Sequence, residues 1–136
     1  MRQVGQVGRV SRVAPDVVLF GAAWPSRALI RAQLIEEGLE VVAVEAWTEM
    51  RRWLQPGMKP RAAILDLKDV DEPSAVLTDL SALMRPERVL VIAAEGTVPG
   101  ADIERLGFLV MSRPVSVDAL VKGVGRIVRA AGDSDW

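Results

Sequence analysis

The sequence contains neither cysteine nor histidine. Without cysteine, the chain cannot form disulfides, bind zinc through thiolates or use a thiol as a nucleophile. Without histidine, it lacks the imidazole ligand of most transition-metal sites and the side chain that most often exchanges protons near neutral pH. Together the two absences exclude most hydrolytic triads, and we predict no metal site of the transition-metal type.

Long apolar runs and a surplus of basic charge are missing as well. No uninterrupted apolar stretch approaches the roughly 20 residues that cross a bilayer, and the N-terminus has no apolar core of the signal-peptide type. We therefore expect a cytoplasmic protein without a membrane segment. The 17 basic and 18 acidic residues give a net charge of −1. This balance argues against nucleic-acid binding, which normally requires a clear basic surplus.

A chain of 136 residues is long enough for one domain with its own core. In residues 1–15 valine recurs at every third position and arginine is the only charged residue type. Because glycines between the valines weaken both helix and strand, we predict a flexible basic N-terminal tail. The alternative is a basic strip that docks on a partner or on a second copy. Residues 16–130 are predicted to form the domain, and residues 131–136 a C-terminal tail.

Short apolar runs alternate with helix-type spacing throughout the predicted domain. Runs of β-branched and large apolar residues predict five strands, at residues 17–21, 39–44, 61–67, 89–93 and 108–111. Apolar spacing, prolines and glycines predict five helices, at residues 26–37, 49–54, 73–86, 99–106 and 117–128. We expect Thr48 to cap the second helix. Along the first helix we expect Ala28, Ala32 and Ile35 to form the apolar face, with Leu29 and Ile30 beside them.

This alternation predicts an α/β fold, a doubly wound (βα)5 arrangement with a five-stranded parallel sheet covered on both faces. The crossovers between parallel strands are expected to be right-handed. In open parallel sheets, ligands and chemistry lie beyond the carboxyl ends of the strands. The residues at these ends are 21–24, 45–47, 66–69, 93–97 and 112–114.

These strand ends carry a resemblance to a known family. Residues 16–130 resemble the receiver domain of bacterial response regulators, the CheY-like domain of two-component signalling. The resemblance rests on ILDL around Asp66, MSRPVSVDAL at 111–120, VLFGAAWPSR at 18–27 and Gly-Phe at 107–108. It implies a flavodoxin-like sheet with strand order 2-1-3-4-5.

Receivers accept a phosphoryl group on an aspartate that ends the third strand, with Mg²⁺ held by an acidic pair after the first. By this resemblance Asp66 occupies the phosphoacceptor position, and the acidic pair falls on Ala22 and Ala23. The hydroxyl residue that moves onto the phosphate falls on Ala93. The lysine that pairs with the phosphate falls on Arg113, which keeps the positive charge but presents a planar fork.

These replacements remove most of the chemistry that the resemblance implies. Alanine offers Mg²⁺ no ligand atom, and Asp66 alone is a poor substitute for a pocket of three carboxylates. Catalysis of phosphoryl transfer depends almost wholly on positioning and on stabilisation of negative charge. Without the metal, the negatively charged carboxylate and the negatively charged phosphoryl donor repel each other. We therefore expect weak Mg²⁺ binding or none, no other cofactor and no enzymatic activity. Asp66 is expected to form an ion pair with Arg113, because their strand ends are neighbours.

Two tryptophans, Trp24 and Trp47, are predicted at the same end of the sheet as Pro114. They are interpreted as apolar lids over the altered cleft or as a recognition surface, since tryptophan is enriched at binding hot spots. The simpler alternative is ordinary packing over a strand edge.

The leading hypothesis is a pseudo-receiver that acts as a phosphorylation-independent protein-interaction module. Its partner would be a histidine kinase or another signalling protein, or a second copy, bound through the face of the fourth helix, fifth strand and fifth helix. Gly123 and Gly125 weaken the last helix, which suggests that a partner approaches closely there. Two alternatives stay open. One is a degenerate receiver that is slowly phosphorylated at Asp66; the other is a small-ligand-binding domain that uses Trp24, Trp47 and Arg113.

Overall fold

A computed structural model describes residues 15–21 and 26–132 of the chain. Residues 1–14 of the predicted N-terminal tail (1–15) and residues 133–136 of the predicted C-terminal tail (131–136) lie outside these described residues, whereas residues 131 and 132 belong to the last helix. Three predicted site residues, Ala22, Ala23 and Trp24, also lie outside the described residues.

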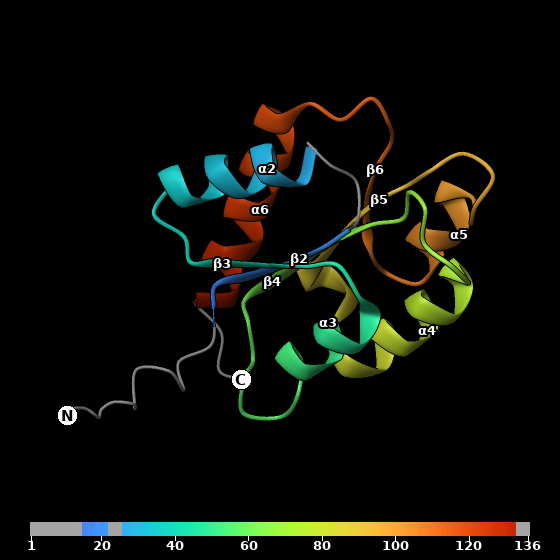
Figure 1. Ribbon diagram of the computed structural model, residues 1–136, viewed down its shortest axis with the longest axis horizontal. Coiled ribbons are helices and arrows are strands. Elements are labelled where there is room, and N and C mark those ends of the chain that lie inside the picture. Colours follow the sequence, from blue (N-terminus) through green and yellow to red (C-terminus); the bar gives the residue numbers. More distant parts are fainter. Residues whose placement is uncertain (1–14, 22–25, 133–136) are drawn as a thin grey trace.

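The strands form one parallel sheet in the order β3-β2-β4-β5-β6 (Figure 1). Their bounds are β2 Val17–Phe20, β3 Val41–Val44, β4 Ala62–Asp66, β5 Val89–Ile92 and β6 Leu109–Met111. Counted along the chain, this is the order 2-1-3-4-5, so the predicted fold class and strand order are confirmed. All four pairings are parallel, and the carboxyl ends of the strands therefore lie at one edge of the sheet.

The helices cover both faces of this sheet (Figure 1). Their bounds are α2 Ser26–Glu36, α3 Trp47–Trp53, α4 Pro73–Leu83, α5 Gly100–Arg105 and α6 Val117–Gly132, with a 3₁₀ turn η2 at Pro86–Arg88. Helices α2 and α6 pack on one face, and α3, α4 and α5 pack on the other. Among the described residues, no helix has both the length and the apolar character needed to span a membrane.

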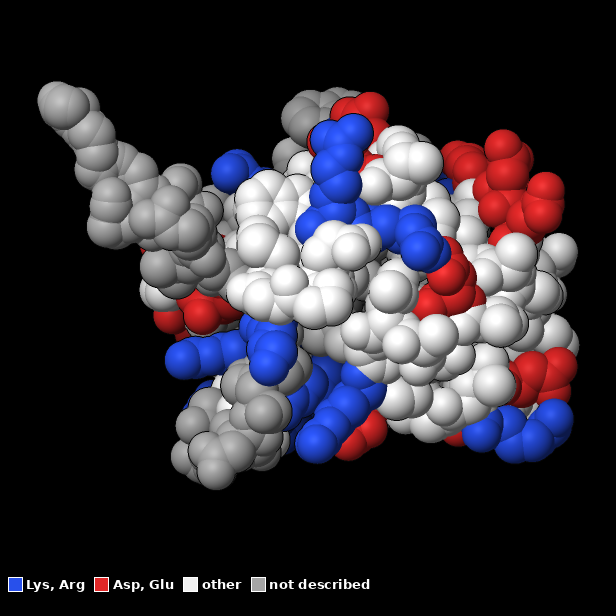
Figure 2. All heavy atoms as spheres, turned by 90° about the horizontal axis from the view of Figure 1, so that it is seen from below, with Lys and Arg blue, Asp and Glu red and all other residues white. Residues whose placement is uncertain are grey.

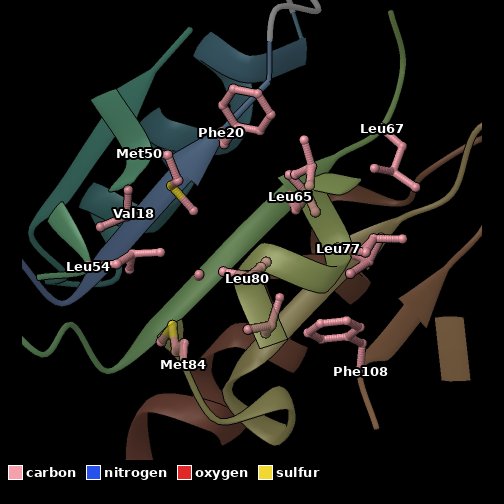
Figure 3. Close-up of a cluster of buried hydrophobic side chains, with 14 of the residues drawn as sticks. Val18, Phe20, Met50, Leu54, Leu65, Leu67, Leu77, Leu80, Met84 and Phe108 are labelled. Atoms are coloured by element: carbon pink, nitrogen blue, oxygen red, sulfur yellow. The ribbon is translucent and has the colours of Figure 1, made fainter. Parts of the chain in front are cut away.

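Successive side chains of each strand enter two separate cores, as the pleat of a strand requires. Val18, Phe20 and Leu65 point into the core under α3, α4 and α5 (Figure 3). Val17 and Ile64, each one residue away, point into the core under α2 and α6. Because both faces are covered, the strands are apolar apart from Asp66 at the end of β4, which explains why continuous apolar runs predicted them correctly.

The predicted apolar face of α2 is wrong for Ala32 and Ile35, whereas Ile30, predicted beside it, is buried. The buried side chains of this helix are Ile30 and Leu34, whereas Ala32 is exposed and Ile35 is 45% exposed. The helix carries apolar residues on two sides, so spacing alone does not select one of them. Packing selects the side with the larger side chains, because burying isoleucine and leucine removes more apolar area from water than burying alanines.

The predicted helix cap at Thr48 is also wrong. Helix α3 begins at Trp47, its N-cap is Ala46, and no side chain caps it. Thr48 is exposed within the helix. The start of this helix is instead held by tertiary contacts of Trp47, which are described below.

The glycines of α6 are expected from the sequence to allow a partner protein to approach closely, but at Gly123 the neighbour is the sheet of the same chain. This residue is buried, and a Cβ atom added to it would lie 3.4 Å from Leu90 Cδ1 of β5. Gly123 therefore allows α6 to pack closely on its own sheet. It gives no support for a partner protein at that position.

Candidate functional site

The sheet register brings three predicted site residues to one edge. Asp66 is the last residue of β4 and is paired with Ile92, the last residue of β5, which in turn is paired with Met111 of β6. Ala93 follows β5 directly, and Arg113 lies two residues beyond the end of β6. The convergence of strand ends expected from the sequence is therefore present in the described part of the chain.

Asp66 and Arg113 form an ion pair at this edge. The Asp66 side chain is only 8% exposed, and that of Arg113 is 30% exposed. Nη2 of Arg113 donates to both carboxylate oxygens of Asp66. The backbone N–H of Lys68 donates to Oδ1 at 3.0 Å. The predicted Asp66–Arg113 pair is confirmed, and it neutralises a carboxylate that has little access to water.

Gly21 allows the end of β2 to approach Asp66. A Cβ atom added to Gly21 would lie 2.9 Å from Cβ of Asp66, closer than side-chain carbons pack. The N–H of Gly21 donates to the carbonyl of Val44 at 3.3 Å, which continues the pairing of β2 with β3. Sequence reasoning did not identify this role, although a glycine directly after a strand often marks a close approach of backbone.

Arg27 is a second cation near this edge, and sequence reasoning missed it. Its Nη1 donates to the carbonyl of Gly21 at 2.8 Å, and its Nη2 pairs with Oε2 of Glu45 at 2.9 Å. The Arg27 side chain is 16% exposed, whereas that of Glu45 is 71% exposed. Arg27 thus ties the first turn of α2 to the ends of β2 and β3. These contacts join residues 6 and 18 positions apart, beyond the spacing of neighbours on one helix, so no helical pattern indicates them.

Trp47 connects α3 to the sheet and to α4. Its ring meets that of Phe20 edge-on, with centroids 5.8 Å apart and planes at 71°, and its Nε1 donates to Oδ2 of Asp79 at 2.7 Å. Arg51 also pairs with Oδ2 of Asp79. The hydrogen bonds from Arg51 and then from Trp47 lower the pKa of Asp79, and the bond to Asp79 raises the pKa of Arg51. The interpretation of Trp47 as a packing residue is confirmed.

Several depressions open at this end of the described surface, and two of them are bordered by Asp69. The larger one is bounded by Lys68, by the segment 93–100 and by the segment 112–114, so it includes Ala93, Arg113 and Pro114. Trp47 lines a separate, smaller depression with Phe20, and Asp69 borders both. The expectation that Trp47 and Pro114 share one cleft is therefore corrected. They lie on different sides of Asp69 because Trp47 turns toward Phe20 and Asp79.

The acidic side chains at this edge do not gather around a common point. In residues 15–21 and 26–132, no group of three or more carboxylates could hold a metal ion together. Ala93 is partly buried and donates its backbone N–H to the carbonyl of Met111 at 2.8 Å, and its side chain offers no hydroxyl. Among the described residues, the polar side-chain chemistry next to Asp66 is thus mainly that of Arg113.

No protein-family model matches the chain, and no curated protein matches its sequence. Solved structures match its fold. A signal receiver domain from Vibrio parahaemolyticus is 21% identical, with a TM-score of 0.70 over 88% of this chain and 94% of the other. The receiver domain of the Francisella response regulator 1452 is 16% identical, with a TM-score of 0.71 over 85% of this chain and 98% of the other. A response regulator receiver protein from Sinorhizobium medicae is 14% identical, with a TM-score of 0.68 over 87% and 97%. The chain therefore has the fold of a response-regulator receiver domain.

Proposed function

We propose that this chain is a receiver-type module of two-component signal transduction that works through protein contacts, without a phosphoryl group on Asp66 and without enzymatic activity. The observation that carries the proposal is the engagement of Asp66 by Arg113. The receiver fold supports the signalling context. The proposed partner is a histidine kinase, another signalling protein or a second copy of the chain.

The surroundings of Asp66 oppose phosphorylation in two ways. A carboxylate that accepts a phosphoryl group must direct one free oxygen at phosphorus in line with the leaving group. In this protein both oxygens accept hydrogen bonds from Arg113, and Oδ1 also accepts one from Lys68. The positive charge of the guanidinium stabilises the carboxylate and so reduces its nucleophilicity.

The fold family uses Mg²⁺ in this reaction, and the residues of this chain fit it poorly. The acidic-pair positions hold Ala22 and Ala23, whose side chains contain no ligand atoms. The described part of the chain has no cluster of three metal-binding side chains. Since Mg²⁺ requires oxygen ligands in near-octahedral geometry, one carboxylate already paired with arginine does not make a site. Weak or absent Mg²⁺ binding is therefore part of the proposal.

The face of α5, β6 and α6 is the proposed contact surface. Leu106, directly after α5, is 45% exposed, and Leu109 in β6 is 46% exposed. Strand β6 is also at the edge of the sheet, where backbone groups remain available for pairing. Exposed leucines beside an edge strand support binding of a protein surface there.

The direct test is tryptophan fluorescence of the wild type and of Asp66→Asn, titrated with Mg²⁺ and then with beryllofluoride. Trp47 reports from the same edge of the sheet through its contact with Phe20. We expect no saturable change in either protein, and no phosphorylated species by mass spectrometry after incubation with acetyl phosphate. A saturable change that Asp66→Asn abolishes would instead establish a phosphorylation switch.

A restored variant provides the positive control for this test. It combines Ala22→Asp, Ala23→Asp, Ala93→Thr and Arg113→Lys, and so returns the residue types of the receiver family to the matching positions. Because these changes supply metal ligands and free Asp66 from the guanidinium, we expect a response to Mg²⁺ with beryllofluoride. A wild-type response as large as that of the restored variant would contradict the proposal.

The two alternative functions make different predictions. Slow phosphorylation at Asp66 is supported by the position of its carboxylate at the end of β4. It predicts a phosphorylated species that is lost in Asp66→Asn. A small-ligand function is supported by the depression beside Arg113, and it predicts that a metabolite raises the melting temperature without Mg²⁺.

A further inference from the structure

A mainly apolar groove lies between the loop after α3 and the end of α4. Its volume is about 360 Å³. The loop contributes Leu54, Pro56 and Pro60, and the helix end contributes Ala82, Leu83 and Met84. Leu54 and Met84 also belong to the buried core under α3, α4 and α5. The groove is thus a place where this core comes to the surface.

The groove is remote from Asp66. The loop that forms one wall leads into the first residue of β4, and the end of α4 leads through η2 into the first residue of β5. The groove therefore lies at the amino-terminal edge of the sheet, opposite the edge that holds Asp66. Figure 3 shows Leu54 and Met84 at one end of the buried cluster, with Leu67 at the other. A ligand in this groove would not contact the Asp66–Arg113 pair.

Two basic side chains, Lys59 and Arg85, line the groove. Residues 51–61 contain four basic side chains and no acidic one. Arg51 and Arg61 pair with Asp79 and Asp16. The groove-lining Lys59 and Arg85 are exposed, and among the described residues neither has a carboxylate within ion-pair distance. Figure 2, which shows the molecule from below, has a largely uncharged central area with both basic and acidic side chains around it.

We propose that this groove binds an acidic segment of a partner protein that carries a large apolar side chain. The apolar side chain would occupy the space between Pro56 and Leu83, and flanking carboxylates would pair with Lys59 on the loop wall and Arg85 on the helix wall. Of residues 82–88 only Glu87 is acidic, and it does not line the groove. The charge around the groove therefore favours an acidic occupant and disfavours a basic one.

The shape of the groove favours a peptide over an enclosed small molecule. Its volume of about 360 Å³ is at the lower end of the range for small-ligand pockets, and it is bounded by one loop and one helix end rather than closed on all sides. Such a groove accommodates a protruding side chain while the partner backbone stays outside. The proposal adds a second surface and the chemistry of a partner to the proposed function, and its test does not involve Asp66.

The test is an NMR titration of the ¹⁵N-labelled full chain with the capped peptide Glu-Glu-Leu-Phe-Glu-Glu. We expect saturable shifts confined to residues 54–61 and 82–88, and weaker binding as salt concentration rises. Two further peptides are matched controls: Lys-Lys-Leu-Phe-Lys-Lys lacks the acidic charge, and Glu-Glu-Ser-Ser-Glu-Glu lacks the apolar side chains. Both are expected to bind at least about tenfold more weakly.

Variants of α4 localise the binding. Ala82→Glu places a carboxylate on an exposed position of the groove wall and should weaken the acidic peptide about tenfold by like-charge repulsion. Ala75→Glu makes the same change at an exposed position of the same helix outside the groove, and it should leave the affinity unchanged. Alanine and glutamate are both good helix formers, so both variants are expected to fold.

Three results would overturn the proposal. The first is chemical shift changes that do not saturate or that lie outside the groove. The second is binding of the basic peptide as tight as that of the acidic one. The third is the same loss of affinity in Ala82→Glu and in Ala75→Glu. A separate titration with decanoate tests for a small ligand. If decanoate shifts the resonances of the same residues at a lower concentration than the peptide does, the groove is a site for a small anionic amphiphile instead. Asp66→Asn should bind the peptide like the wild type. Failure of the groove and failure of the proposed function are thus observed in separate experiments.

Discussion

Asp66 and Asp79 have almost the same partners but very different surroundings. Each accepts hydrogen bonds from an arginine and from one further N–H group, which is the Lys68 backbone for Asp66 and the Trp47 indole for Asp79. The Asp66 side chain is 8% exposed, whereas that of Asp79 is 34% exposed. Water can therefore replace the partners of Asp79, but it has little access to Asp66.

This difference decides what each pair does. An arginine next to a half-exposed carboxylate contributes little net stability, because solvent screens the interaction. Next to a buried carboxylate, the arginine is needed, since removing it leaves a charge without compensation. Asp79 thus ties α3 to α4, whereas the buried Asp66 depends on Arg113 for a compensating charge.

The largest expected effect is that of Arg113→Ala. It leaves the buried Asp66 carboxylate without its cation, and we expect the free energy of unfolding to fall by about 2–3 kcal/mol. Urea unfolding followed by circular dichroism measures this loss. Arg113→Lys keeps the charge and should lose less. If Arg113→Ala lowers the free energy of unfolding by less than about 0.5 kcal/mol, burial does not make the Asp66–Arg113 pair more important for stability than the Asp79–Arg51 pair.

Gly21→Ala should have the second-largest effect. We expect the free energy of unfolding to fall by about 2 kcal/mol, because the new methyl group would overlap Cβ of Asp66. The matched control is Gly100→Ala, where the added Cβ atom would lie 3.7 Å from Val110 Cγ1, an ordinary contact distance. The control should be neutral or slightly stabilising. If the two variants unfold at the same urea concentration, the end of β2 can move away from Asp66.

Trp47→Phe tests the more exposed pair and should have a smaller effect, about 1 kcal/mol. The variant retains an aromatic ring against Phe20 but removes the N–H group that donates to Asp79. Thermal unfolding of the two proteins gives the difference. A loss as large as that of Arg113→Ala would show that Asp79 depends on its partners as strongly as Asp66 does.

The smallest effect is expected from the titration of Asp79. Its folded-state pKa lies below the ordinary value of 3.8 because Arg51 and Trp47 donate hydrogen bonds to its charged form. The contribution of these bonds is therefore present above that ordinary value and is lost as the pH falls through the lowered pKa. Asp79→Asn should show a flatter fall in stability than the wild type as the pH is lowered from about 5 to 2. Parallel curves from urea unfolding at each pH would contradict this assignment.

Much of the fold could be predicted because buried parallel strands have a simple signature. Strand β2 is apolar along its whole length, and β4 is apolar up to its last residue, Asp66, since both faces of the sheet are covered. Gly38, with a φ of 89°, ends the first helix region as expected from its freedom to adopt positive φ. The pairing of Asp66 with Arg113 could also be expected, because strand order places their ends together.

The wrong predictions concern features for which the sequence offers two similar choices. Helix α2 has apolar residues on both sides, so the choice of Ile30 and Leu34 over Ala32 and Ile35 depends on what packs against it. Thr48 is a good capping residue, but the contacts of Trp47 with other elements begin the helix earlier. Local preferences of this size are routinely overridden by tertiary packing.

The sequence by itself determined the order of the elements and the chemistry that the chain lacks. It has no cysteine or histidine, residues 22 and 23 are alanines, and residue 113 is an arginine. Only the tertiary structure decided which groups meet: Arg27 with Gly21, Trp47 with Asp79, and the helix end of α4 with the basic loop after α3. The reason is physical. Local patterns extend over about one helical turn, whereas these contacts depend on strand order, helix packing and burial, which exist only once the whole chain has folded.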